Sequence, residues 1–310
     1  MRLFITALAC LISVSVFGQL FACEFCNIKG DVKSIVGTNN FVIEKFGEII
    51  GDPQRKNDSY EHHFKQDGYL LILKTIEYDS DESIKSRVIY EYDDEGNRVE
   101  TISYDSEENI KWKSTEEYDD EGNRVETIDY DSDGNKSDRF TYKYNDKGNR
   151  VKEIGYNKDG SINRKDTYEY DEEGNKVETI SYDSEENISN RSTYKYNDKG
   201  NQVERIWYNS DGSISSKNTY EYDDEGNRVE TISYDSEENI KRKSTDEYDK
   251  EGNIVKEIGY NKDGSISHNF TYEFIYDNQG NWTRYTKYST GSFGKEEAKW
   301  LREREYEYYD

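Results

Sequence analysis

The residues best suited to chemistry are the three histidines, His62, His63 and His268. No nucleophile motif accompanies any of them, and a metal site would need further ligands that converge with His62 and His63. We therefore interpret His62 and His63 as a solvated pair in a loop, and we predict no metal site and no cofactor. Because the sequence repeats itself, it offers the same residues everywhere, whereas an enzyme needs unlike residues at one place. We predict no catalytic residues and no enzyme activity.

A possible calcium ligand set lies in residues 131–135, Asp-Ser-Asp-Gly-Asn. A complete calcium loop needs further oxygen ligands, including a distal bidentate glutamate, and these are absent at the required spacing. Aspartate, glycine and asparagine are also the residues that tight turns prefer. We interpret the segment as a turn, although weak and delocalised cation binding along the acidic edges remains an alternative.

The first 18 residues have the pattern of an export signal. Arg2 precedes a short apolar run that ends at Gly18, which predicts a signal peptide over 1–18 and a mature chain from Gln19. A lipid anchor on Cys23 is the alternative, since residues 20–23 resemble a lipobox. Cys26 makes a lone C-x-x-C with Cys23, with no context for redox or zinc chemistry. No other apolar run is long enough for a transmembrane span. We predict an exported protein that is periplasmic, outer-surface or extracellular.

Composition narrows the partners and raises a question about order. The 67 acidic and 42 basic residues give a net charge of −25, which repels nucleic acid. Only 32% of residues are hydrophobic, and no leucine lies between Leu73 and Leu301, so a conventional aliphatic core is not available there. The chain nevertheless contains 29 tyrosines. We infer that the tyrosines are ordered by the repeat.

A period of 26 residues organises most of the chain. Glycines recur at this spacing from Gly96 to Gly252, and a stretch of 22 residues is identical at 90–111 and 220–241. Within a unit, turn signals such as 93–97 and 105–109 alternate with segments of strand length that are rich in β-branched and aromatic residues. The pattern predicts an all-β fold: a repetitive antiparallel β-hairpin meander of ~17 strands that forms one long twisted or curled sheet.

The faces of this sheet follow from parity. Counted from each glycine, isoleucine and tyrosine occupy even positions, as in Ile102, Tyr104, Ile110, Tyr168 and Tyr170. Because side chains alternate along a strand, we expect all of these on one buried face and polar residues on the other. If part of this ladder is exposed, it could stack on sugar rings or on a partner protein. The residues that would then bind the ligand are Tyr92, Tyr118, Tyr144, Tyr170, Tyr196 and Tyr222.

The pattern also predicts a domain organisation. The signal peptide over 1–18 is followed by N-terminal cap strands and a loop over 19–60, with 52–62 as the loop. The repeats cover 61–288, and a C-terminal capping hairpin covers 289–310. Caps are expected because an open sheet edge invites pairing with other chains.

The motif Tyr-Asp-x-x-Gly-Asn recurs in register from Tyr92 to Tyr276, with Asn replacing Asp at Asn145 and Asn197. Over roughly 64–288 the chain resembles the YD repeats of Rhs-type proteins, and in particular small exported members from Bacteroidetes-like bacteria that lack a toxin module. This resemblance implies hairpin strips, often coiled into shells, and cell-surface display or carbohydrate contact. We expect an exported, non-catalytic scaffold for binding or adhesion, with a protein or carbohydrate partner at the cell envelope. The alternatives are a purely structural surface spacer and a glycan-binding module that uses exposed tyrosines.

Overall fold

The computed structural model describes residues 32–45, 48–66, 70–79, 83–290 and 296–308. The predicted signal peptide and both Cys23 and Cys26 lie outside the described residues, so the export and lipid-anchor expectations stay predictions. The described chain is a single antiparallel sheet of 20 strands. None of the described segments forms a helix that could cross a membrane.

The strands follow one another with little intervening chain. Their bounds are β1 Val32–Lys45, β2 Glu48–Gln66, β3 Leu70–Tyr78, β4 Ile84–Tyr92, β5 Arg98–Tyr104, β6 Ile110–Tyr118, β7 Arg124–Asp131, β8 Lys136–Tyr144, β9 Arg150–Tyr156, β10 Ile162–Tyr170, β11 Lys176–Tyr182, β12 Ile188–Tyr196, β13 Gln202–Tyr208, β14 Ile214–Tyr222, β15 Arg228–Tyr234, β16 Ile240–Tyr248, β17 Ile254–Asn261, β18 Ile266–Tyr276, β19 Trp282–Thr290 and β20 Glu296–Tyr308.

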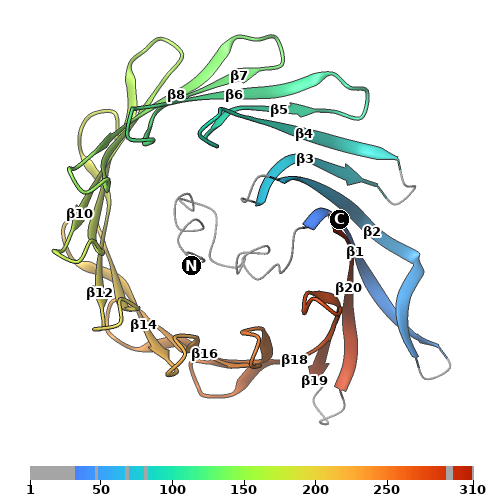
Figure 1. Ribbon diagram of the computed structural model, residues 1–310. Helices are drawn as coiled ribbons and strands as arrows, with labels where there is room; N and C mark the ends of the chain where they lie inside the picture. Colours follow the sequence, from blue (N-terminus) through green and yellow to red (C-terminus); the bar gives the residue numbers. More distant parts are fainter. Residues whose placement is uncertain (1–31, 46–47, 67–69, 80–82, 291–295, 309–310) are drawn as a thin grey trace, which may run out of the picture.

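The sheet curls until its two ends meet. Each strand pairs with the next in sequence, and β1 also pairs with β20 from Val32 to Asn40, so the strands form a ring (Figure 1). The hairpin meander and the single curled sheet are confirmed. The predicted loop over 52–62 is wrong, because this segment lies in β2 and its backbone pairs with β1 and β3. The terminal segments do not shield two open edges as expected, since their backbone groups satisfy each other.

Two kinds of turn join the strands. The first turns, such as 93–97, hold Gly96 at a φ of 87°; the backbone N–H of Asp93 donates to the carbonyl oxygen of Asn97, and that of Gly96 donates to the carbonyl oxygen of Asp93. The second turns, such as 105–109, use the same backbone pattern, and the left-handed position is occupied by glycine in some units and by Glu108, Glu186 or Glu238 in others. The first turns are 93–97, 119–123, 145–149, 171–175, 197–201, 223–227, 249–253 and 277–281, and the second turns are 105–109, 131–135, 157–161, 183–187, 209–213, 235–239 and 261–265.

The expectation that isoleucine and tyrosine share one face is wrong. Beside each first turn the register shifts, from Glu91 opposite Glu100 to Tyr92 opposite Arg98, and an equivalent shift lies beside each second turn. Each shift inserts one residue, as in a β-bulge. Even positions of one strand therefore share a face with odd positions of the next. One face, which we call the tyrosine face, carries Tyr90 opposite Thr101, and the other, the isoleucine face, carries Ile102.

Burial differs from expectation at the strand starts. Because the sheet is one layer, few side chains are fully buried, and they include Ile35, Leu301 and the smaller Thr101 and Ser103. The isoleucines that open the strands after the second turns were expected to be buried. They are between 38% and 58% exposed, because they lie at the end of the sheet beside the turns: Ile84, Ile110, Ile162, Ile188, Ile214, Ile240 and Ile266.

Candidate functional site

The six tyrosines predicted to bind a ligand end the strands that enter the first turns. We call Tyr92, Tyr118, Tyr144, Tyr170, Tyr196 and Tyr222 the tyrosine row. The hydroxyl of Tyr170 donates to the carbonyl oxygen of Arg150 over 2.8 Å, and the same bond recurs from Tyr118 to Tyr222. Burial raises the pKa of each phenol, to about 12 in Tyr196. The hydroxyls from Tyr118 to Tyr222 therefore link neighbouring hairpins, and the rings of the tyrosine row are half-buried.

A second row of tyrosines, two residues earlier on the same face, is stacked with cations. The guanidinium of Arg150 lies 5.5 Å from the ring centre of Tyr142 and 5.1 Å from that of Tyr168. The ammonium of Lys176 lies 5.4 Å from Tyr168 and 5.3 Å from Tyr194. Such cation–π contacts stabilise by about 0.5–1 kcal/mol each where partly exposed. The faces of these rings are thus occupied by side chains of the same chain.

Asparagine completes most first turns through an aspartate. In the turn at 223–227, Asp223 accepts hydrogen bonds from the backbone and the side-chain amide of Asn227 at 2.7 and 2.9 Å. The bond from that amide lowers the pKa of the Asp223 carboxyl. Asp131, considered above as a calcium ligand, is used in the same way, because its Oδ1 accepts the backbone N–H groups of Asp133 and Asn135. Among the described residues, no three His, Cys, Asp or Glu side chains form a metal-binding group.

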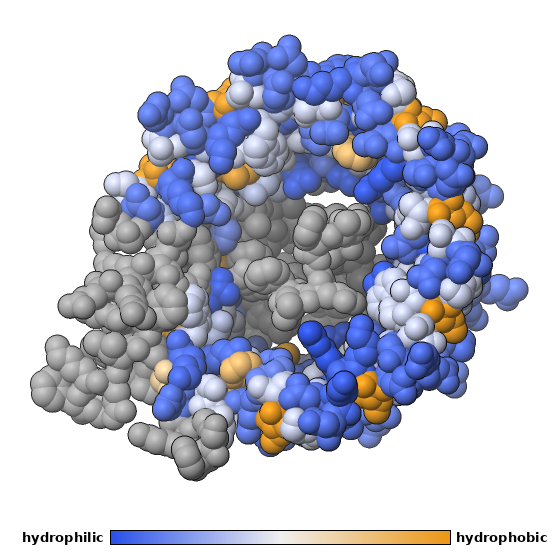
Figure 2. Space-filling model, turned by 180° about the vertical axis from the view of Figure 1, so that it is seen from behind, coloured by the Kyte–Doolittle hydropathy of each residue, from blue (hydrophilic) through white to orange (hydrophobic). Residues whose placement is uncertain are grey.

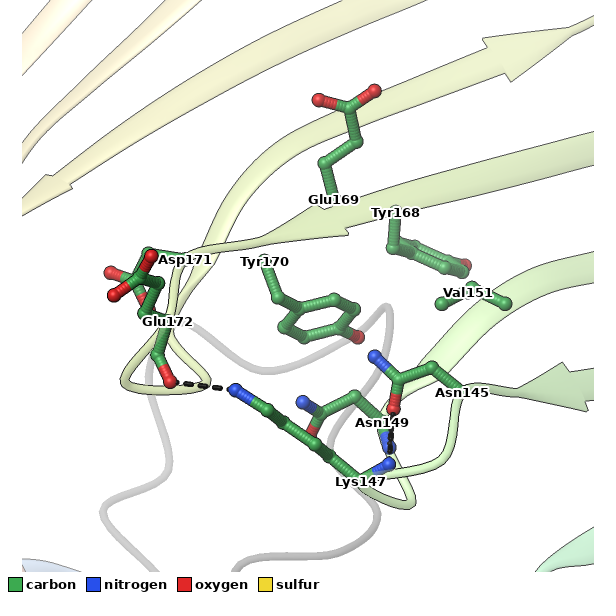
Figure 3. Close-up of a pocket in the computed structure, with 9 residues that line it drawn as sticks. All are labelled: Asn145, Lys147, Asn149, Val151, Tyr168, Glu169, Tyr170, Asp171 and Glu172. Atoms are coloured by element: carbon green, nitrogen blue, oxygen red, sulfur yellow. Dashed lines mark hydrogen bonds between the residues drawn. The ribbon is translucent and has the colours of Figure 1, made fainter.

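The turn at 145–149 opens a groove of about 510 Å³ towards the next first turn (Figure 3). Tyr168, Tyr170 and Val151 line it, and the Lys147 ammonium donates across it to the carbonyl oxygen of Glu172 over 2.7 Å. Lys199 makes the equivalent bond to Asp224 over 3.1 Å. Of the tyrosine row, only Tyr170 lies in this groove.

Hydrogen-bond donors distinguish this groove from the acidic turns. Asn145, like Asn197, stands where the remaining first turns have aspartate, and its Oδ1 accepts the backbone N–H groups of Lys147 and Asn149. Without a carboxylate, the side-chain amide nitrogens of Asn145 and Asn149 have no hydrogen-bond partner in the described part of the chain. The groove therefore offers two free amide donors and an ammonium group beside tyrosine rings.

One cluster of unlike residues was missed from the sequence. On β17, Glu257 accepts from the Tyr272 hydroxyl over 3.1 Å and lies 3.1 Å from Nε2 of His268, and Asp246 lies directly opposite it. Burial, and then the charge of Glu257, raise the pKa of Asp246. We call these four residues the Glu257 cluster. The signal in the sequence was its departure from the repeat, since Asp246 stands where most units have tyrosine.

The histidines are placed differently from expectation. His62 and His63 lie in β2 and not in a loop, and Nδ1 of His62 is 2.9 Å from the hydroxyl of Thr75. His268 lies opposite Gly259, where a Cβ would meet the imidazole in its present position, so a larger residue there would displace the ring.

Comparisons with known proteins concern the fold. No model of a known protein family matches the sequence, and no curated protein does. The structure of a Photorhabdus luminescens Tc holotoxin pore with a TccC3 mutation is similar, with a TM-score of 0.41 and 12% identity over 85% of this chain and 14% of that chain. The structure of a TcdB2-TccC3-Cdc42 complex has a TM-score of 0.38 and 11% identity, over 87% of this chain and 17% of that chain. The structure of a porin-like protein from Bacteroides uniformis has a TM-score of 0.36 and 14% identity, over 90% of this chain and 99% of that chain. This chain thus spans less than a fifth of the toxin chains, and these likenesses assign no activity.

Proposed function

We propose that this protein is an exported, non-catalytic scaffold of the YD-repeat type that binds a protein or carbohydrate at the cell envelope. The observation that carries the proposal is the groove at 145–149, where Asn145, Asn149 and Lys147 offer donors beside Tyr168 and Tyr170. The residue types that line it recur in the unit that contains Lys199. A repeated site of this kind suits multivalent attachment, in which several weak contacts give high avidity.

The tyrosine contacts favour one mode of binding. The hydroxyls from Tyr118 to Tyr222 are already bonded to carbonyl oxygens, and the second row of rings is covered by cations, as in Tyr168. A ligand would therefore contact ring edges and turn amides rather than stack on free ring faces.

The non-catalytic part of the proposal has one serious challenger. Ser267 Oγ lies 3.2 Å from Nδ1 of His268, whose Nε2 lies 3.1 Å from Glu257. A hydrolase would also need donors aimed at a developing oxyanion. The backbone of β18 around His268 pairs with β17, and from Phe270 onward it also pairs with β19. We therefore assign this chain of contacts to structure.

A turn exchange tests the proposed function. The double substitution Asn145→Asp and Lys147→Glu gives the sequence of the turn at 119–123, so the fold is expected to persist. Binding of the mature protein to isolated envelope fragments, measured by biolayer interferometry, should weaken, and the same exchange at Asn197 and Lys199 should weaken it further. The reverse exchange at 119–123 serves as the matched control and should strengthen binding. Unchanged binding in all three variants, or no binding by the native chain, contradicts the proposal.

Unit deletion separates a scaffold from a spacer. Removing residues 144–169 joins equivalent positions, and the remaining hairpins should still fold because each unit is stabilised by its neighbours. Multivalent binding should then fall by degrees, whereas one embedded site would be lost abruptly and a spacer would have no ligand to lose. Removing 144–156 shifts the alternation by an odd number and should prevent folding.

A further inference from the structure

Seven isoleucines form a regular row at one end of the ring. The isoleucine row consists of seven residues that each begin a strand and are 38–58% exposed: Ile84, Ile110, Ile162, Ile188, Ile214, Ile240 and Ile266. Six of them follow a second turn, and Ile84 follows Asp79 and Ser83, whose backbones share the same hydrogen bond. Figure 2 shows separate apolar patches that recur around the ring among hydrophilic surface. Each isoleucine lies opposite a tyrosine of the isoleucine face, as Ile110 lies opposite Tyr104. Apolar exposure that recurs with the repeat calls for an explanation.

The fold itself does not require this row. At the equivalent position after the turn at 131–135 the residue is Lys136, which begins β8 and lies opposite Tyr130 in the same register. The strand therefore begins and pairs in the same way, and follows the same kind of turn, when a charged residue takes this position. Isoleucine is thus not required at this position for a hairpin to form, as Lys136 shows.

The charge beside the row selects the partner. The seven second turns are rich in carboxylates, and their only basic residues are Lys158 and Lys262. Where basic residues of the strands reach these carboxylates, the glutamates remain largely exposed, as in the pair of Lys165 with Glu186, whose side chain is 74% exposed. A second copy of this chain would bring two acidic ends together, and an anionic lipid surface would be repelled as well. A surface that alternates apolar and negative groups is complementary to one that alternates apolar and positive groups.

We propose that the isoleucine row is a docking surface for a cationic amphipathic polypeptide. Apolar side chains of the partner lie against the isoleucines, while its lysines or arginines lie against the carboxylates of the second turns. The row lies on the face opposite the tyrosine row, so this proposal does not depend on the function proposed above. Because the contacts are separate and repeated, affinity accumulates along the row.

Defined probes test the chemistry. The full mature chain is titrated against a fluorescent peptide of alternating leucine and lysine, and binding is followed by anisotropy. Peptides with glutamate for lysine, or serine for leucine, are the controls. The leucine–lysine peptide should bind at least about tenfold more tightly than the serine–lysine peptide, and added salt should weaken it. Equal binding of these two peptides would show attraction by charge alone and would overturn the proposal.

Variants with precedent in the repeat locate the site. Ile188→Lys copies Lys136 and should weaken the leucine–lysine peptide about tenfold, whereas Lys136→Ile completes the row and should tighten it about threefold. Ile275→Lys is the control, because Ile275 is 55% exposed but lies outside the row. Circular dichroism should be unchanged in all three. Equal effects of the changes at 188 and 275 would contradict the site.

The same variants also test two other partners for the isoleucine row, a second copy of the chain and a lipid surface. Self-association of the chain that Ile188→Lys abolishes would assign the row to a second copy. Binding to phosphatidylcholine or phosphatidylglycerol vesicles that the same variant abolishes would assign it to lipid. Either result overturns the proposal.

Discussion

Two clusters at equivalent positions of the repeat, four units apart, surround an equivalent glutamate with different neighbours. Glu153 lies between Tyr142 and Asp166 and bonds Arg150 and Arg164 at 3.1 and 2.9 Å. We call these the Glu153 cluster. In the Glu257 cluster, the chain has Asp246 in place of Tyr142, His268 in place of Arg164, Ile254 in place of Arg150 and Phe270 in place of Asp166. The Glu153 side chain is 10% exposed and that of Glu257 is 32% exposed.

The difference shows what the sheet needs in order to bury a charge. Around Glu153, two carboxylates meet two guanidinium groups, which cannot lose their protons. Around Glu257, two carboxylates meet one imidazole, and the charges of Arg228 on β15 and of Lys287 on β19 also interact with this pair. Burial lowers the pKa of Lys287, whose ammonium lies 3.6 Å from the ring centre of Phe270. The same backbone thus carries a compensated cluster and an undercompensated one.

Exchange of the residue at the strand start should give the largest effect. Arg150→Ile copies Ile254 and removes both the ion pair with Glu153 and the stacking on Tyr142 and Tyr168. A buried carboxylate that loses a partner destabilises strongly, and we expect a loss of about 2–3 kcal/mol in the free energy of unfolding. Urea denaturation measures it.

The reverse exchange sharpens the comparison. Ile254→Arg brings a guanidinium beside Asp246 and Glu257, and it should stabilise the chain by about 1 kcal/mol. If Arg150→Ile and Ile254→Arg destabilise the chain equally, stability depends on burial of the arginine stem and not on its charge. The two clusters would then not differ in charge compensation.

The next effect is a pH dependence of stability, which has opposite signs for Asp246 and for the turn aspartates. Since burial and Glu257 hold the folded pKa of Asp246 above its unfolded value of about 3.9, protonation of Asp246 stabilises the fold. This contribution is complete below the unfolded pKa and is lost as the pH rises through the raised folded pKa. Hydrogen bonds lower the pKa of turn aspartates such as Asp223, so their contribution is lost as the pH falls through the folded value. Mild acid should therefore protect β16 and β17 while it loosens the first turns.

Hydrogen exchange of individual segments measures both trends, after correction for the intrinsic rate at each pH. Asp246→Asn removes the titrating group, so β16 and β17 should lose their separate trend and stability near neutral pH should rise by up to about 1 kcal/mol. A retained trend in this variant would mean that another group titrates there.

The regular part of the molecule was predictable, and its exceptions were not. The spacing of glycine and asparagine in turns such as 93–97 fixes hairpin length and strand order through local backbone conformation. Face assignment failed because one inserted residue beside Tyr92 and one beside Tyr104 change the parity, and such bulges leave no mark on a periodic pattern. The pairing of β1 with β20 lies outside the repeat, so periodicity contains no information about it. The groove contained one predicted tyrosine, Tyr170, while the Glu257 cluster arose from substitutions that a consensus averages away.

The smallest effect is expected from exchange of the exposed cation. Arg164 is 45% exposed and bonds both Glu153 and Asp166, so Arg164→His should cost only about 0.5–1 kcal/mol, and less in high salt. His268→Arg should gain less than that, because Phe270 offers no second carboxylate. Both exchanged side chains lie opposite a glycine, Arg164 opposite Gly155 and His268 opposite Gly259. Because glycine has no side chain, an imidazole or a guanidinium is expected to fit at either position. Thermal melts in low and high salt separate charge from fit, since a change in stability that salt does not reduce would come from packing of the new side chain against the strand.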